Sequence, residues 1–408
     1  MSSKQTLAAA ALLFSGAAAA QSSVTLYGTV GVTMTYTNNV QTAATSPNGR
    51  PVGGAQFGQL ELGYTGIGPS KWGLLGVEDL GGGLKAIFKL ENGFNTNNGT
   101  LGQGGAMFGR EAKLGLAGSW GEIAAGHLLD SAADFVNPLT FAWNWGNFAA
   151  HPGDYDNLNS SHFINNSVKY LSSSWGGFRF GGLYSFGGVS GSLGRNQLWE
   201  AGLSYAGGPL SVGAVITNAR NPNVSLYGTS ANASSLTNNL GTAGSATSAA
   251  YNPVAAGFAS ARTTQVVGLA AKYDLGPASV GLAYSNTLFS GLGANKALNA
   301  NGYSGTASLN NYEASVRYQV NPVVGVGASY DYTNAGGVSG QDGAKYHQFN
   351  ISSYYALSKS TTLMLLVAYQ HATGTNSFGQ PAVASISYLS PSATNKQTMV
   401  SAGLSHAF

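Results

Sequence analysis

The sequence has little charge, no cysteine and no long apolar run after its first residues. Only 8% of the 408 residues are charged, whereas an average soluble domain has about 25%. Without cysteine the chain forms neither a disulfide framework nor a thiolate metal site. A formal net charge of +3 is too small to indicate a nucleic-acid partner. Beyond residue 20 no stretch approaches about 18 consecutive apolar residues, so membrane-spanning helices are not expected.

The first 20 residues differ from the rest. Lys4 precedes an apolar run over residues 7–20, with alanine at positions 18 and 20. This is the pattern of a secretory signal peptide with a small-x-small cleavage site. The alternative, a short transmembrane helix, requires about 20 apolar residues, and the run is shorter. We therefore expect residues 1–20 to be a cleaved signal peptide and residues 21–408 to be the mature chain.

Apolar and polar side chains alternate along much of the remaining sequence. Over residues 23–37 the even positions are apolar or glycine, and the odd positions are mostly threonine. Segments 84–91, 178–186 and 311–320 alternate in the same way, with their charges confined to one face. A period of two is the signature of a β-strand whose two faces meet different surroundings.

Short and long connections alternate between these strands. Seven short ones, rich in Gly, Pro, Asn or Ser, lie at 80–83, 119–121, 174–177, 206–209, 275–277, 320–322 and 357–360. Eight long polar ones lie at about 38–70, 96–106, 130–161, 188–196, 220–262, 290–308, 335–344 and 372–395. Together they separate 16 strands, with short turns and both termini on one rim and long loops on the other. That is the pattern of an outer-membrane barrel.

The predicted fold is all-β: a 16-stranded antiparallel transmembrane β-barrel with short periplasmic turns and long extracellular loops. In hydrocarbon a sheet satisfies all of its backbone polar groups only by closing on itself, and sixteen strands leave an aqueous lumen. A soluble β-sandwich would also alternate, but such domains are usually smaller and have shorter strands. The Ser/Ala/Asn/Gly-rich segment 220–262 is expected to be a surface loop without a packed core.

Several stretches resemble the general porins of beta-proteobacteria. They are KWGLLGVEDLGGGLKAIFKLENGF (71–94), FGREAKLGLAGSWGEIAAG (108–126), NNSVKYLS (165–172) and the ending GLSHAF (403–408). The resemblance runs from Ser23 to Phe408. It implies a homotrimer in the lipid bilayer of the Gram-negative outer membrane, passive diffusion of small hydrophilic solutes and ions, and a third loop folded into the lumen. It also implies that Phe408 is the signal read by the barrel-assembly machinery; alternatively, Phe408 is an interfacial aromatic residue.

Strand parity predicts which charges reach the lumen, where charges at the narrowest point set selectivity. The predicted pore-lining basic wall consists of Lys85, Lys89, Lys113, Lys169, Arg179, Lys272 and Arg317. Glu91, Glu111 and Glu313 share the inward parity. Arg110 has the outward parity, and its position stays open. Any one of these charges could instead lie in a wide vestibule and have little influence.

The third loop, 130–161, has four acids and neither Lys nor Arg: Asp130, Asp134, Asp154 and Asp156. If the loop folds inward, these constriction-loop acids would face the basic wall and create a transverse field that favours polar solutes. The alternative is that they cap turns, as Asp commonly does.

Three positions depart from the arginines usual in the family: Phe163, Ser405 and His127. These losses put the anion preference implied by the resemblance in doubt. The third loop is also aromatic, so Trp143 and Trp145, with Phe163 opposite, form a candidate aromatic eyelet; packing against the wall is the alternative. The sequence thus predicts a channel with weak charge selectivity.

Two other classes of function fit the sequence less well. Catalysis is not expected, because His151 with Asp154 and Asp156 is the only tight cluster of histidine and acids, and general base catalysis requires a geometry that spacing does not supply. No spacing indicates a metal site, and no cofactor is expected. An adhesin or anchor would have a plugged lumen, but 21–408 contains no separate plug domain.

Overall fold

The computed structural model describes residues 23–45, 51–59, 64–65, 68–228, 237–242 and 252–408. The expected signal peptide, residues 1–20, lies outside the described residues, as do parts of the expected loops 38–70 and 220–262.

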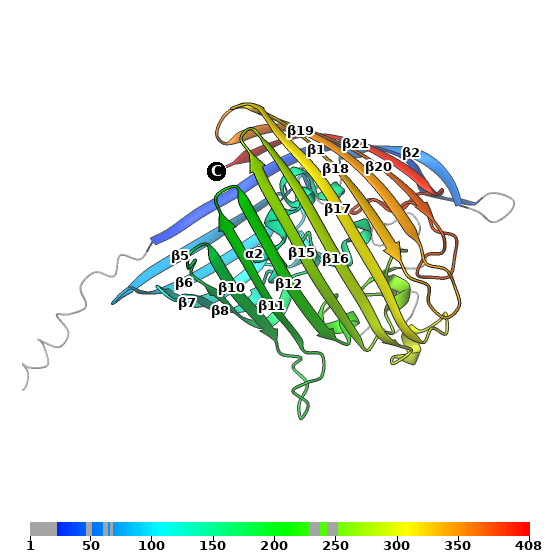
Figure 1. Ribbon diagram of the computed structural model, residues 1–408, viewed down its shortest axis with the longest axis horizontal. Coiled ribbons are helices and arrows are strands. Elements are labelled where there is room, and N and C mark those ends of the chain that lie inside the picture. Colours follow the sequence, from blue (N-terminus) through cyan, green and yellow to red (C-terminus); the bar gives the residue numbers. More distant parts are fainter. Residues whose placement is uncertain (1–22, 46–50, 60–63, 66–67, 229–236, 243–251) are drawn as a thin grey trace, which may run out of the picture.

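The strands form a closed antiparallel sheet around a lumen, as Figure 1 shows. Around the ring they are β1 (Ser23–Thr45), β5 (Lys71–Gly81), β6 (Leu84–Gly93), β7 (Glu111–Gly118), β8 (Gly121–Leu128), β9 (Ile164–Ser172), β10 (Phe178–Ser185), β11 (Leu198–Gly207), β12 (Leu210–Arg220), β15 (Thr263–Leu275), β16 (Ala278–Leu292), β17 (Gly305–Asn321), β18 (Val324–Ala335), β19 (Lys345–Ala356), β20 (Thr361–Thr373) and β21 (Lys396–Ala407). β21 pairs with β1 and closes the ring. The predicted 16-stranded barrel is confirmed.

The two faces of the wall follow the predicted alternation. On β1, Val32 and Met34 are each 42% exposed on the outside, whereas Thr33 and Thr35 are 3% and 2% exposed on the inside. The same rule holds on β17, where Val316 is exposed and Ser315 is buried. An outer face of large apolar side chains matches a hydrocarbon surrounding, where backbone groups must be paired within the sheet.

The first long loop, expected over 38–70, is wrong in its bounds. β1 continues to Thr45 and pairs with β2 (Pro51–Gln59). β2 and β5 pair with successive parts of the same edge of β1, so the 17 strands of the sheet occupy 16 positions around the ring. Between them the Ser70 hydroxyl lies 3.0 Å from the Gly31 nitrogen and 3.1 Å from its carbonyl oxygen. This hydroxyl satisfies the backbone where the ladder is interrupted.

The third loop folds into the barrel, as predicted. It carries short helical turns that lie inside the ring in Figure 1: α2 (Ala132–Phe135), η2 (Asn137–Leu139), α3 (Phe141–Trp145), η3 (Asn147–Ala149) and η4 (Pro152–Asp154). Wall glycines make room for it. A Cβ at Gly202 would lie 2.2 Å from the Phe135 ring, and one at Gly213 would lie 1.8 Å from the Phe135 carbonyl oxygen.

The remaining elements lie in the other loops. They are η1 (Gln103–Gly105), α4 (Pro222–Ser225), η5 (Ala256–Phe258), η6 (Lys296–Leu298) and two small hairpins, β3 (Tyr64–Thr65) with β4 (Gly68–Pro69) and β13 (Thr237–Asn238) with β14 (Gly241–Thr242). The expectation that loop 220–262 has no packed core is wrong for its last part, because Val254 and Phe258 belong to a buried cluster with Phe289 and Tyr346. Throughout the described residues, every helix is too short or too polar to cross a bilayer.

Candidate pore constriction

Two cations of the predicted basic wall hold the third loop in place. Lys169 on β9 donates to the carbonyl oxygens of Leu129 and Asp130, both at 3.0 Å, and forms an ion pair with Asp134. Arg317 on β17 donates to the carbonyl oxygens of Leu139 and Thr140 at 3.0 and 2.7 Å. These side chains therefore fix the backbone of the loop to two separate parts of the wall.

The loop acids do not lie as expected. Asp130, Asp154 and Asp156 are 2%, 3% and 2% exposed, and they are bonded within the loop or toward the wall. Asp130 accepts hydrogen bonds from Ser160 at 2.7 Å and Asn157 at 2.9 Å. Buried carboxylates that fold the loop cannot face the basic wall across the lumen. The predicted transverse field therefore needs correction, and of the four acids Asp134 is the most exposed.

Asp154 follows the alternative, turn-capping role. Its carboxylate accepts the backbone N–H groups of Asn159 at 3.0 Å and Ser161 at 3.2 Å. Burial, reinforced by the neighbouring Asp156, raises the pKa of Asp154 to about 7. Burial, reinforced by Glu200 on the wall, likewise raises the pKa of Asp130 well above its usual range. Both carboxyls therefore contribute less negative charge than the sequence alone implies.

A cavity of about 380 Å³ lies between the loop and the wall. Its lining includes Thr29, Pro69, Lys71, Arg110 and Phe163 from the wall side, Trp143, Asn147, Asn159, Ser160 and Ser161 from the third loop, Lys359 from the short turn between β19 and β20, Tyr388 from the loop before β21, and Ser405 from β21. Among the described residues that line it, three are cations and none is a carboxylate. This cavity is the candidate constriction.

Beside the cavity, the wall carries interleaved ion pairs centred on Glu91. Arg110 lies 2.7 Å from the Glu91 carboxylate, with Lys89 at 3.3 Å and Lys71 at 3.6 Å. Lys89 also lies 2.7 Å from Glu111. Farther along, Lys113 lies 2.6 Å from Glu122 and 3.5 Å from Glu111. Four cations and three carboxylates thus alternate in this group of ion pairs, so the group itself has one more positive than negative charge.

Arg110, whose position the sequence left open, lies at the constriction. Its guanidinium carbon is 5.3 Å from the centre of the Phe163 ring, a cation–π distance. The His127 ring lies 5.7 Å from that same ring. Strand parity could not place Arg110 because it precedes β7. Strand parity would, however, have placed Lys71 on the inner face, because Lys71 is the register partner of the inward-facing Thr29.

Two of the three predicted eyelet residues line the cavity, Phe163 and Trp143. Trp145 does not: it is 8% exposed and stacks on Phe141 with ring centres 5.9 Å apart. The α-turn places residues 143 and 145 on different sides, so one aromatic ring faces the lumen while the other packs against the wall.

The other predicted wall cations lie away from the cavity. Lys85, Arg179 and Lys272 stand near the ends of β6, β10 and β15 that meet the short turns, and Lys272 is paired with Asp274 at 3.1 Å. Phe408 extends β21, and its backbone exchanges two 3.0 Å hydrogen bonds with Gly28 of β1. Its ring covers Gly28, where a Cβ would lie 2.4 Å away.

The model of the Gram-negative porin family matches residues 6–308 and 227–377 of the chain. An outer membrane porin protein of Bordetella pertussis is 36% identical over 234 residues, which is 51% of this chain and 58% of the relative. Outer membrane porin protein 32 of Delftia acidovorans is 35% identical over 225 residues, 51% of this chain and 57% of the relative. The chain thus spans little more than half the length of these curated relatives.

Among solved structures, an anion-selective porin from Comamonas acidovorans superimposes with a TM-score of 0.67 at 22% identity. The match covers 95% of this chain and 100% of that chain. At this identity the likeness shows a shared fold.

Proposed function

The chain belongs to the Gram-negative porin family, and from this premise we propose that it forms a water-filled channel for passive diffusion of small hydrophilic solutes and ions across the outer membrane. The observation that carries the proposal is the cavity of about 380 Å³ between an inward-folded loop and a charged wall. Family membership favours a channel over an enzyme built on a barrel. A permanent plug is disfavoured because the third loop leaves this cavity open.

We further propose a preference for anions, stronger than the weak selectivity expected from the sequence. Lys71, Arg110 and Lys359 line the cavity without a carboxylate among the described lining residues, and three of the loop acids are buried. Charges at a constriction set the sign of selectivity. The name of the Comamonas porin, anion-selective, is consistent with this.

Purified protein in planar bilayers under a KCl gradient tests both proposals. We expect stepwise increases in current as single channels insert. We also expect a reversal potential whose sign shows that chloride is more permeant than potassium. A cation-selective potential would overturn the anion preference, and a protein that inserts without conducting would favour an anchor or adhesin.

The assembly is proposed on the resemblance to trimeric porins: a homotrimer whose chains lose residues 1–20 on export and are recognised by the barrel-assembly machinery through Phe408. Light scattering of the detergent-extracted protein gives the number of chains per particle, and the mass of the mature chain gives its cleavage site. A monomeric particle or an uncleaved chain would contradict these proposals.

A further inference from the structure

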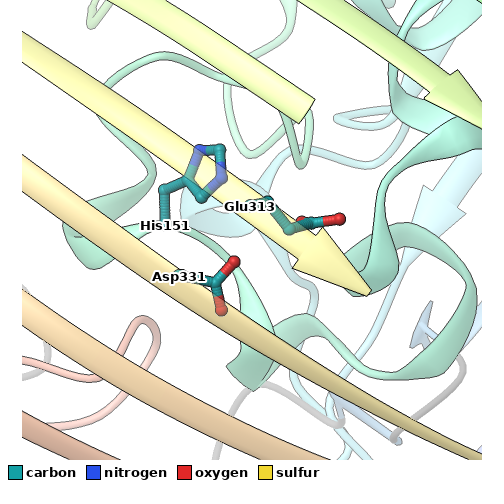
Figure 2. A group of neighbouring side chains, drawn as sticks. All are labelled: His151, Glu313 and Asp331. Atoms are coloured by element: carbon teal, nitrogen blue, oxygen red, sulfur yellow. The ribbon is translucent and has the colours of Figure 1, made fainter. Parts of the chain in front are cut away.

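Three chemically reactive side chains meet between the third loop and the wall. Figure 2 shows His151 of the loop beside Glu313 of β17 and Asp331 of β18. Each offers one ligand atom, and these atoms all lie within 4.8 Å of one another. The residues are 3%, 3% and 1% exposed, so the group is enclosed by protein.

The two carboxyls are direct neighbours in the sheet. Glu313 and Asp331 are register partners on the inner face of β17 and β18. Like charges directly opposite each other destabilise a sheet, and burial makes an uncompensated pair more costly. Arg317, which stands near Glu313, directs its Nη2 at the loop carbonyls of Leu139 and Thr140. A further cation or a proton close to the pair would therefore relieve its repulsion.

The hydrogen bonds leave one side of the group unsatisfied. Glu313 Oε1 accepts the Phe141 N–H at 2.8 Å, and Asp331 Oδ2 accepts the Asn350 amide at 2.7 Å. Asp331 Oδ1 and His151 Nε2 are buried without a hydrogen-bond partner among the described residues. Both unpartnered atoms belong to the three-residue group.

His151 is oriented by a carboxylate on the far side of its ring. Its Nδ1 lies 2.6 Å from the Asp156 carboxylate, which also accepts Ser285 at 2.5 Å and Asn311 at 3.0 Å. In the neutral ring with Nδ1–H donated to Asp156, Nε2 carries a lone pair that can bind a metal ion. A carboxylate that holds the far nitrogen of a histidine is the usual support for a metal ligand.

We propose that His151 Nε2, Glu313 and Asp331 bind a divalent transition-metal ion such as Zn²⁺. One imidazole and two carboxylates suit this class of ion. The bound ion neutralises the carboxyl pair and ties the third loop to β17 and β18, so the site is structural and does not depend on what passes through the lumen. A small cavity of about 10 Å³ adjoins His151 and Glu313, which is about the space of one water or ion.

A proton on His151 is the competing way to supply positive charge. Burial opposes that charge, but Asp156 and the other carboxylates outweigh burial and raise the pKa of His151 to about 10. A metal ion at Nε2 displaces this proton. The two states therefore differ in bound metal, which can be counted directly.

The test uses full-length protein in detergent, stripped with a chelator and dialysed against Zn²⁺. We expect one zinc per chain by elemental analysis, a higher unfolding temperature with Zn²⁺ than without, and a smaller effect of Ca²⁺ or Mg²⁺. X-ray absorption at the zinc edge should show mixed nitrogen and oxygen ligands. Wild-type protein that retains no zinc and gains no stability would overturn the proposal.

Variants locate the ion. Asp331→Asn and His151→Gln should each weaken zinc binding by about tenfold or more, and His371→Gln on β20 is the matched control. If either variant fails to fold, X-ray absorption spectra of the zinc-loaded wild-type protein show whether the ion has nitrogen and oxygen ligands. Equal zinc binding by wild type and Asp331→Asn, or a spectrum without a nitrogen ligand, would contradict the assignment.

Discussion

The guanidinium of Arg110 lies 5.3 Å from the centre of the Phe163 ring. Arg110 also lines the constriction cavity with Lys71. Part of the positive charge at this cavity therefore comes from a side chain just before β7. Phe163 provides the surface over which it lies.

Arg110→Gln should move the channel toward cations. A unit charge about 4 Å from a passing ion is worth about 1 kcal/mol in a water-like medium, so we expect roughly a fivefold fall in the chloride-to-potassium permeability ratio. Reversal potentials in a KCl gradient measure it. Arg195→Gln, which removes the same charge from the exposed loop between β10 and β11, should change the ratio little. Equal shifts in both variants would contradict a local role for Arg110.

The two tryptophans of α3 should respond differently to truncation. Trp143→Ala removes a ring from the cavity lining and should raise single-channel conductance with little loss of stability. Trp145→Ala removes a buried ring stacked on Phe141 and should cost about 3–5 kcal/mol, seen as a lower unfolding temperature. A wider pore from Trp145→Ala at unchanged stability would contradict this division.

The sequence predicted most of the barrel because period-two alternation is imposed on every strand by lipid outside and water inside. The pairing of β1 with β2 was not predicted, because residues 38–45 and 51–59 are polar and do not alternate regularly, although they pair as strands. The prediction that the acids of the third loop face the lumen was also wrong for Asp130, Asp154 and Asp156, which are buried. Their role depends on partners far away in sequence, such as the 155-residue separation between Asp156 and Asn311, and spacing along one segment does not show such contacts.

Arg317 should control how firmly the third loop is seated. Its Nη2 donates to two loop carbonyls, and a hydrogen bond from a charged donor is worth about 1.5–3 kcal/mol. Arg317→Met should therefore lower the unfolding temperature and increase current noise from loop movement. Arg179→Met, on the same inner face near the short turns, is the control. Quiet wild-type-like currents from Arg317→Met would show that the loop is held without this contact.

Phe408 should matter more in cells than in detergent. Phe408→Ser should reduce the amount of assembled barrel in the outer membrane if the assembly machinery reads this residue, whereas refolding of the purified chain should change little. Heat-modifiable migration on gels measures both. Phe186→Ser, at another exposed aromatic residue (46% against 55% for Phe408), is the control. A comparable loss on refolding would assign Phe408 to barrel closure over Gly28 instead.

His162, beside the constriction loop, should make stability depend on pH. Burial lowers the pKa of His162 to about 4, against about 6.5 when unfolded, and its ring centre lies 4.8 Å from that of Tyr227. Because the unfolded chain takes up a proton first, this residue's contribution is full above about pH 6.5 and is lost as the pH falls toward 4. The titration of His162 changes the free energy of unfolding by at most about 1.4 kcal/mol per pH unit.

His162→Gln removes that titration, so its unfolding temperature should fall less than that of wild type between pH 6.5 and 4. The comparison is between the two curves, because Asp130, whose pKa is raised, acts with the opposite sign in both proteins. His371→Gln, at a partly exposed histidine of β20, is the control for replacing a histidine away from Tyr227. Parallel curves for wild type and His162→Gln would mean that His162 carries the same proton occupancy in the folded and unfolded chain.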